Sequence, residues 1–150
     1  MDISQLKIKL GEKFKGIEEA DKIDLSGFIV PADQLHEIIV FLKEYEKGKF
    51  NYLFNLTCTD NGDSFTMLYY MESVEERANV VVKTNIDREK PVIPTVADLF
   101  PAAEYLEREV YDLFGVVFEN HPDLRRLFLE DDFGYPLRKD FKDEINIIER

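Results

Sequence analysis

The spacing of apolar and polar positions in the first 48 residues predicts two amphipathic helices. Apolar side chains recur there every three or four positions, which is the helical period. The first helix is expected to bury Leu6, Leu10 and Phe14 on one face. The second is expected to begin after Pro31 and to end at Gly48, because proline suits a helix start and glycine a helix end. Its buried face is expected to consist of Leu35, Ile38, Ile39, Leu42 and Tyr45.

Four segments rich in β-branched and aromatic residues predict strands. The first lies between the two helices, at residues 23–30. Residues 50–59 and 65–71 flank a short polar stretch that contains Asn61-Gly62. An Asn-Gly pair between two such segments is a strong hairpin signal, because both residues tolerate positive φ. Residues 78–84 include three consecutive valines and are expected to form a central strand.

Pro101 suits the first turn of a third helix, which is expected to end at Phe114 and to be closed by Gly115. Its expected core face consists of Ala103, Leu106, Val110 and Leu113. Prolines and glycines recur in residues 116–150, so we expect an extended tail with short turns there. The prediction is one α+β domain, in which residues 1–115 form a mostly antiparallel meander sheet backed by helices. Residues 116–150 are expected to form a docking tail.

Length and composition favour a packed globular domain without a membrane span. The chain has 150 residues, 45% of them apolar, and 12 Phe and 7 Tyr. A net charge of −12 argues against nucleic-acid binding. Cys58 is the single cysteine, which excludes an intrachain disulfide and indicates a reducing compartment. We expect no secretion signal, because the first residues lack its basic start and apolar run, and no stretch reaches the ~20 consecutive apolar residues of a membrane helix. We expect a cytoplasmic protein that reaches a membrane only through partners.

The charged residues of the third helix have two interpretations. Glu104, Arg108 and Asp112 are spaced four apart, so they are expected to form an ion-pair ladder on one exposed face. Alternatively, Glu107 with Glu109 or Asp112 could form a catalytic carboxylate pair. That pair would need a nearby histidine or an apolar pocket to separate the two pKa values, and the sequence indicates neither. The exposed ladder is therefore the favoured interpretation.

Two basic clusters, Arg125-Arg126 and Arg138-Lys139, stand out in an acidic chain. Arginine suits bidentate pairing with a carboxylate across an interface, because its guanidinium is planar and preorganised. One arginine of the first cluster could instead pair within the chain, with Glu109 or Asp112 as partner. Both interpretations stay open.

The segment at residues 135–141 also has two interpretations. Pro136 favours an extended start, with Leu137 and Phe141 on one side and Arg138 and Asp140 on the other. Such a segment could lie as a strap across a partner, or it could be held to its own domain by a contact between Arg138 and Asp140.

Motifs for cofactors are absent from the sequence. The 7 glycines form neither a G-x-G-x-x-G nor a P-loop pattern. An iron–sulfur cluster normally needs four ligands, and the chain has one cysteine. His36, Cys58 and His121 lack metal-ligand spacing. We expect no metal, no cofactor and no catalytic residue in this chain.

Three blocks near the C-terminus combine charge, proline and aromatic residues at fixed offsets. They read Glu107-Arg108-Glu109 with Asp112, then His121-Pro122 with Arg125-Arg126, then Pro136-Leu137-Arg138-Lys139-Asp140-Phe141. In this order and spacing they resemble the C-type, or thirty-kilodalton, subunit of respiratory complex I and of related membrane-bound nickel–iron hydrogenases. Residues 56–60, 65–70 and 94–103 are also similar to that family. Tyr105, Tyr135 and Lys142 depart from its usual residues, which leaves the branch open.

The resemblance implies a non-catalytic structural subunit in the hydrophilic arm of a membrane-attached, ion-pumping NADH:quinone oxidoreductase. It implies D-type and B-type partners, which would hold the quinone site and an iron–sulfur cluster, and a peripheral location on the cytoplasmic face of the membrane. The alternative is the equivalent subunit of a nickel–iron hydrogenase or of a ferredoxin- or deazaflavin-dependent relative. A free-standing carboxylate-dependent enzyme is a remote alternative. The electron donor and acceptor are left undefined.

The same resemblance makes the three blocks the expected partner interface. Arg126 and Arg138 are expected to bind buried carboxylates of the D-type partner, so that charge reversal at either would leave the isolated domain folded and prevent assembly. The expected interface residues are Glu107, Arg108, Glu109, Asp112, His121, Pro122, Arg125, Arg126, Pro136, Leu137, Arg138, Lys139, Asp140 and Phe141.

Overall fold

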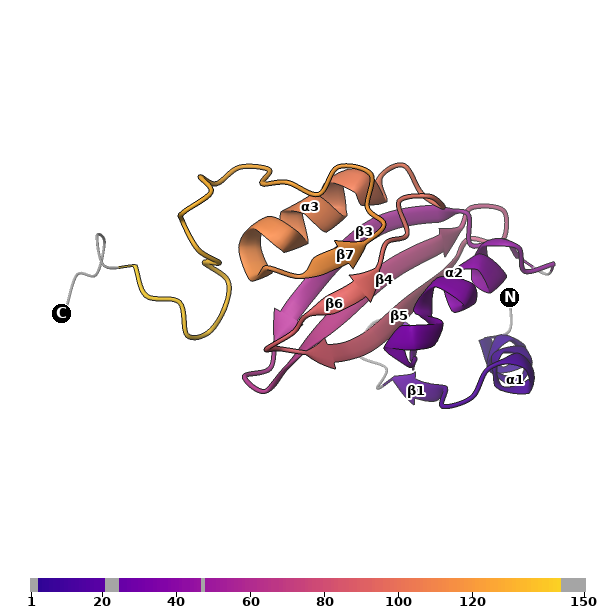
Figure 1. Cartoon of the computed structure of the whole chain (residues 1–150). Helices are drawn as coiled ribbons and strands as arrows, with labels where there is room; N and C mark the ends of the chain where they lie inside the picture. The colour runs from indigo at the N-terminus through magenta and orange to yellow at the C-terminus, as the bar shows by residue number, and fades with distance from the viewer. Residues whose placement is uncertain (1–2, 21–24, 47, 144–150) are drawn as a thin grey trace.

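A five-stranded sheet in the order β1-β2-β5-β4-β3 forms the centre of the molecule. The structure is a computed structural model that describes residues 3–20, 25–46 and 48–143. Strands β3, β4 and β5 are an antiparallel meander, while β2 joins β5 in parallel and β1 pairs antiparallel with β2 (Figure 1). The five strands are β1 Glu18–Ala20, β2 Gly27–Ile29, β3 Tyr52–Asp60, β4 Ser64–Ser73 and β5 Ala78–Asp87.

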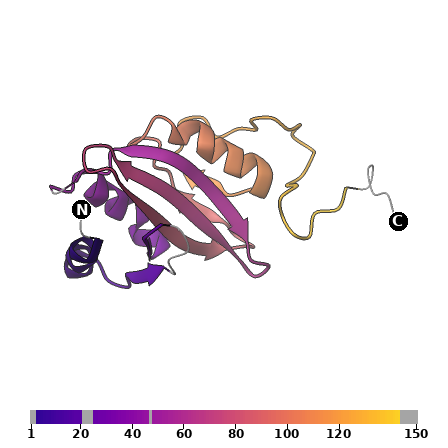
Figure 2. The same cartoon turned by 180° about the vertical axis from the view of Figure 1, so that it is seen from behind.

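One face of this sheet is covered and the other is open. Alternate residues of β4, beginning with Phe65, are buried, and those between them are only partly buried. Figures 1 and 2 show α2, α3 and the small parallel pair β6–β7 on the same face of the sheet. These elements are α1 Ile3–Lys13, the 3-10 turn η1 Ala32–Gln34, α2 Leu35–Lys43, β6 Val92–Pro94, α3 Ala103–Phe114 and β7 Val117–Glu119.

The α+β fold with a meander sheet is confirmed, and so are the apolar faces of the first two helices. Leu6, Leu10 and Phe14 of the first helical segment are buried. The expected residues of α2 also lie in the core: Leu35, Ile38, Ile39, Leu42 and Tyr45. The hairpin at Asn61-Gly62 is present, with Asn61 N–H donating to Ser64 O at 2.9 Å.

Several boundaries differ from those predicted. The α2 helix ends at Lys43, five residues before Gly48, and Phe50 N–H then donates to Leu42 O near the end of the helix. The predicted strand at 23–30 is observed as β2, and residues 23 and 24 lie outside the described part of the chain. Strand β1 was not predicted. A three-residue strand has too short a pattern to show a period in the sequence.

Strand β6 was not predicted, and the segment predicted as an extended tail begins with β7. The two strands pair only with each other, and each buries one apolar residue, Ile93 and Phe118. One of the two strands precedes α3 in the sequence and the other follows it, so no local pattern could indicate their pairing. The division of the domain at residue 115 stays a prediction.

Gly115 closes α3 as predicted, in the left-handed conformation with φ 75° and ψ 24°. Its N–H donates to Tyr111 O at 2.9 Å. A side chain at this position would also meet the tail. A Cβ atom on Gly115 would lie 2.7 Å from the ring of Tyr135 and 2.9 Å from the guanidinium of Arg138. Both the backbone angle and the packing of the tail therefore require glycine here.

We expect Gly115→Ala to lower the free energy of unfolding by more than Gly62→Ala does. Both glycines have positive φ, but a Cβ atom on Gly62 would meet nothing within 4 Å. The backbone cost of roughly 1–2 kcal/mol is common to both variants. Overpacking against Tyr135 adds about 1–3 kcal/mol at Gly115 only. Urea unfolding of the two variants measures the difference, and equal losses would show that the tail does not pack on Gly115.

Candidate interface at the C-terminal tail

The segment that follows β7 runs beside α3 and then past its end. In Figure 1 it is the orange-to-yellow trace, and residues 120–143 contain neither helix nor strand. A segment without a regular ladder must find other partners for its backbone N–H and C=O groups. Side chains of the core and of the tail itself provide many of them, and most of the donors are arginines.

Arg108 of α3 binds the backbone of the tail. Its Nε and Nη2 donate to the carbonyl oxygens of Arg125 and Arg126, at 3.3 and 2.9 Å. Arg108 is only 5% exposed, and Asp112 is fully buried. The predicted exposed ladder of Glu104, Arg108 and Asp112 is therefore wrong. The tail covers this side of the helix, which helical periodicity alone cannot reveal.

Asp112 and Arg126 form a buried ion pair at the centre of this contact. Arg126 Nη1 lies 3.2 Å from Asp112 Oδ1, and the same nitrogen donates to the carbonyl oxygens of Asp112 and Gly134, at 2.7 and 2.9 Å. The other carboxylate oxygen accepts the N–H groups of Phe128 and Leu129, at 2.8 and 3.2 Å. The internal pairing of Arg126 with Asp112, one of the two open interpretations, is confirmed.

Arg138 binds the C-terminal end of α3. Its Nε donates to Phe114 O at 2.6 Å, where a cation also compensates the negative end of the helix dipole. The guanidinium lies over the rings of Phe65 and Tyr135, 5.2 and 4.9 Å from their centroids. The suggested contact of Arg138 with Asp140 is not what holds the segment, because Asp140 pairs with Arg88.

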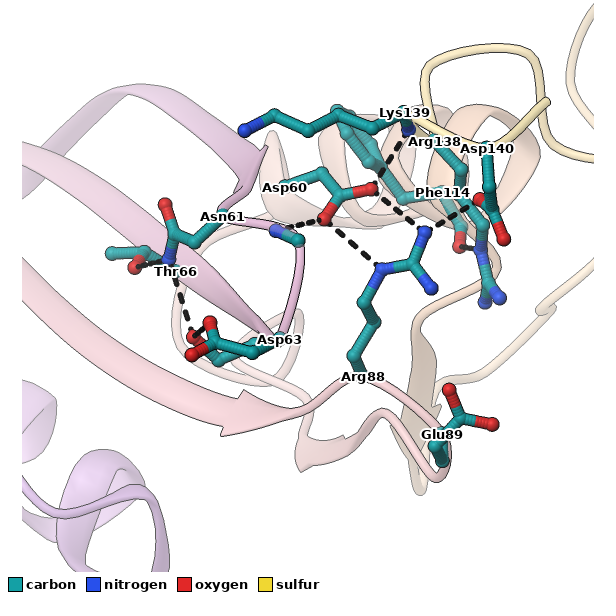
Figure 3. Close-up of polar contacts among 12 residues, drawn as sticks. Asp60, Asn61, Asp63, Thr66, Arg88, Glu89, Phe114, Arg138, Lys139 and Asp140 are labelled. Carbon is teal, nitrogen blue, oxygen red and sulfur yellow. Dashed lines mark hydrogen bonds and ion pairs between the residues drawn. The ribbon is translucent and has the colours of Figure 1, made fainter.

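Asp60 joins the hairpin, the end of β5 and the tail (Figure 3). One of its oxygens accepts Arg88 Nε at 3.0 Å and Gly62 N–H at 2.8 Å. The other accepts Arg88 Nη2 at 3.1 Å and Lys139 N–H at 2.8 Å. The Arg88 hydrogen bonds hold the pKa of Asp60 far below its usual value. No local pattern indicates this network, because Arg88 lies 28 residues and Lys139 79 residues from Asp60.

Glu107 lies in a second buried network, under the start of the tail. Its carboxylate is fully buried and accepts Thr95 Oγ1 at 2.5 Å and Val96 N–H at 2.7 Å. Burial outweighs these two hydrogen bonds and raises the pKa of Glu107 from 4.5 to about 7. Because Asp112 binds Arg126 instead, Glu107 and Asp112 belong to separate networks, which disfavours a catalytic pair.

The expectation of no histidine near these carboxylates is wrong. His121 Nε2 lies 3.9 Å from Glu107 Oε2. The histidine side chain is fully buried, with Nε2 3.0 Å from Glu104 O and Nδ1 accepting Asp123 N–H at 3.0 Å. A neutral ring with its proton on Nε2 satisfies both contacts. The two residues are 14 positions apart, and the turn after β7 brings them together.

The remaining predicted interface residues divide by exposure. Pro122, Arg125, Leu137, Lys139 and Asp140 are exposed, and Arg125 pairs on the surface with Asp123. Glu109, Pro136, Arg138 and Phe141 are half-buried, whereas the side chains of His121 and Arg126 are 0% and 11% exposed. Large apolar side chains that the sequence had not assigned to the interface are also exposed in or beside the tail: Tyr105, Phe128 and Phe133. The assignment of these residues to an interface stays a prediction.

Three further features bear on the kind of site. In the described ranges, no group of three or more His, Cys, Asp and Glu residues is arranged to hold a metal ion. Burial raises the pKa of the Cys58 thiol to about 12. None of the described helices is both long and apolar enough to cross a membrane.

Together, the fold and the tail define an α+β domain whose irregular C-terminal segment is fastened by arginines to the end of one helix. Residues 28–145 match the family model described as "Respiratory-chain NADH dehydrogenase, 30 Kd subunit". The chain belongs to this family.

Relatives and solved structures agree with this assignment. The chain is 43% identical over 137 residues to the C subunit of NADH-quinone oxidoreductase from Moorella thermoacetica, which covers 89% of this chain and 91% of the relative. It is 46% identical over 121 residues to a fused C/D subunit from Phocaeicola vulgatus, covering 78% of this chain but 23% of the relative. A protein in the structure of the archaeal membrane-bound sulfane sulfur reductase superposes with a TM-score of 0.78 and 32% identity, covering 93% of this chain and 85% of that one. A trypsin-resistant fragment of Nqo5 superposes with a TM-score of 0.71 and 29% identity, covering 83% of this chain and all of the fragment.

We expect Arg126→Glu to destabilise the isolated chain strongly, contrary to the expectation from the sequence. The variant leaves Asp112 as a buried carboxylate without its cation, which costs roughly 3–5 kcal/mol of folding free energy. Urea unfolding of the purified chain measures this loss. Arg125→Glu is the matched control, because its exposed pair with Asp123 contributes little, and its midpoint should stay near wild type. Equal midpoints for the two variants would contradict the internal role of Arg126.

We also expect Glu107→Gln to flatten the pH dependence of stability. The folded state holds the Glu107 proton more tightly than the unfolded chain does, so the stabilisation by the protonated form is complete below pH 4.5 and is lost as the pH rises through about 7. Relative to the variant, wild type should lose up to about 3 kcal/mol of unfolding free energy over this window. Denaturation at pH 4.5, 6 and 8 measures it, and parallel curves would contradict the pKa assignment.

Proposed function

We propose that this chain is a non-catalytic structural subunit of a membrane-attached, ion-pumping oxidoreductase complex of the NADH:quinone type. The chain docks through its tail and the adjoining end of α3 onto the D-type and B-type subunits of the complex. It sits on the cytoplasmic face of the membrane and is held there by these partners. It binds no cofactor, and the iron–sulfur clusters and the quinone site belong to the partner subunits.

The observation that carries this proposal is the two-sided character of the tail. Its inner side is fixed to the domain by Arg108, Arg126 and Arg138, which bind carbonyl and carboxylate oxygens. Its outer side exposes Phe128 (75%) and Leu137 (52%) to solvent. Large apolar side chains on a fixed surface are typical of protein interfaces, because binding them orders few additional groups. Family membership then supplies the kind of assembly.

The D-type partner has support from the relatives. In Phocaeicola vulgatus and Aquifex aeolicus, the matching proteins are named as C/D subunits of NADH-quinone oxidoreductase. A fused chain keeps its two parts at high effective concentration, which favours an interface between them. The B-type partner rests on the family resemblance alone.

A second candidate is the equivalent subunit of a membrane complex with other electron chemistry. The TM-score of 0.78 with the sulfane sulfur reductase complex favours this candidate, and the superposition covers 93% of this chain. The alternatives of a nickel–iron hydrogenase and of a ferredoxin- or deazaflavin-dependent complex belong to the same class. The 43% identity to a protein named for NADH–quinone oxidoreduction favours the first candidate.

We expect an affinity-tagged copy of this chain to bring D-type and B-type subunits with it from native membranes solubilised in mild detergent. The three subunits should be recovered in equal amounts, because a structural subunit stays bound to its partners with one copy of each in the complex. Mass spectrometry and densitometry of the purified complex measure this ratio. Recovery of the tagged chain alone would contradict the proposed function.

The chain produced on its own serves as the control for cofactor content. It should contain less than stoichiometric iron and nickel by elemental analysis, and it should lack absorbance in the visible range. A stoichiometric metal in the isolated chain would contradict the assignment of all redox centres to the partners.

A further inference from the structure

The loop formed by residues 128–133 carries the most exposed large apolar side chain in the described part of the tail, Phe128. Phe128 is 75% exposed and Phe133 is 44% exposed. The loop backbone is nevertheless fixed. Phe128 N–H donates to the buried carboxylate of Asp112 at 2.8 Å, and Phe133 N–H closes a turn on Glu130 O at 3.1 Å. Two phenyl rings are thus displayed to solvent on a backbone that is already ordered.

Three acidic side chains, Glu130, Asp131 and Asp132, stand between these two rings, and all three are exposed. Within the described part of the chain, their carboxylates make no hydrogen bond and no ion pair. Phe133 itself stacks on Phe141 of the tail, with 5.9 Å between ring centroids. The loop therefore combines apolar side chains with unneutralised negative charge.

The nearest arginines in sequence do not neutralise this charge. Arg126 is turned inward to Asp112, and Arg125 pairs with Asp123. The sequence indicated that basic residues of the tail would meet carboxylates of a partner. In the structure, Arg126 and Arg138 bind groups inside the domain, and the carboxylates lie on the outside of the loop. The tail therefore presents negative charge here, where the sequence had indicated positive charge.

We propose that the 128–133 loop is the anchor of the docking surface and that it fits an apolar patch with a basic rim on the D-type subunit. This inference rests on the proposed function. Charge complementarity points to the occupant, because three free carboxylates on a chain of net charge −12 attract lysine and arginine and repel an acidic surface. Buried aromatic side chains with a charged rim are typical of the energetic centre of an interface. The D-type part is the one that shares a polypeptide with the C-type part in the fused relatives.

The test is recovery of the D-type subunit with the tagged full-length chain from native membranes. The loop variant is Glu130→Lys/Asp131→Lys/Asp132→Lys. The matched control is Glu37→Lys/Glu75→Lys/Glu89→Lys, which changes the net charge equally at exposed positions outside the tail. At about 0.15 M salt, we expect the loop variant to lose about tenfold or more of the D-type subunit, and the control to stay within about twofold of wild type.

A second pair of variants tests the apolar side chains. Phe128→Ser should reduce recovery of the D-type subunit, whereas Ile8→Ser, which changes a 60% exposed residue of α1, should not. The loop variant, its charge-matched control and Phe128→Ser, produced as isolated chains, should melt near the wild-type temperature, because the altered side chains have little internal packing or pairing. A normal melting temperature together with lost assembly assigns the effect to the interface.

The outcomes separate this inference from the proposed function. Equal recovery of the D-type subunit with wild type and with the loop variant would overturn the inference alone. Equal loss in the loop variant and in its charge-matched control would also overturn it, because the effect would then be one of net charge. Loss of the D-type subunit from wild type on adding EDTA would assign the carboxylates to a metal ion and overturn it as well. Absence of the D-type subunit from the wild-type preparation would overturn the proposed function and the inference with it.

Discussion

The buried ion pair between Asp112 and Arg126 holds residues 126–134 of the tail against α3. Removing a carboxylate from water is costly unless its oxygens are bound by cations or N–H groups. Asp112 meets this requirement only when the tail lies against α3, since Arg126, Phe128 and Leu129 all come from the tail. The charge of one helical residue thus sets the position of a segment that has no secondary structure of its own. Arg108 adds the complementary contact, from the helix to the tail backbone.

This arrangement explains how a domain can present a fixed surface without extending its sheet. The tail is ordered by groups on its inner side, so the charge and polarity of its outer residues need not match those of the residues that hold it. Cations face inward at Arg126 and Arg138, while Phe128 and the acidic residues that follow it face outward. A partner that meets this surface does not have to order it first, which lowers the entropic cost of association. The same ion pairs also make the tail sensitive to substitutions that a surface location would tolerate.

Local patterns in the sequence were sufficient for much of the fold. Helical periodicity identified the buried faces of α1 and α2, and the Asn61-Gly62 pair identified the hairpin. Gly115 was recognised as a helix end because a left-handed residue there favours glycine. Such features depend on residues within a few positions of one another, so a single sequence contains them. The spacing of the charged and proline-containing blocks was likewise sufficient to indicate the family.

The tertiary structure alone decided which charged residues are buried and what they bind. Periodicity placed Arg108 and Asp112 on a solvent face, because a helical pattern cannot show that a later segment covers it. Asp60 meets Arg88 and the backbone of Lys139 only in the folded chain, and β6 finds its partner β7 across the length of α3. These contacts join residues far apart in the sequence, and their free energy depends on burial that arises only when the whole domain has packed. The sequence therefore determined the elements and their faces, and packing determined the inward direction of the arginines and the exposure of the acidic loop.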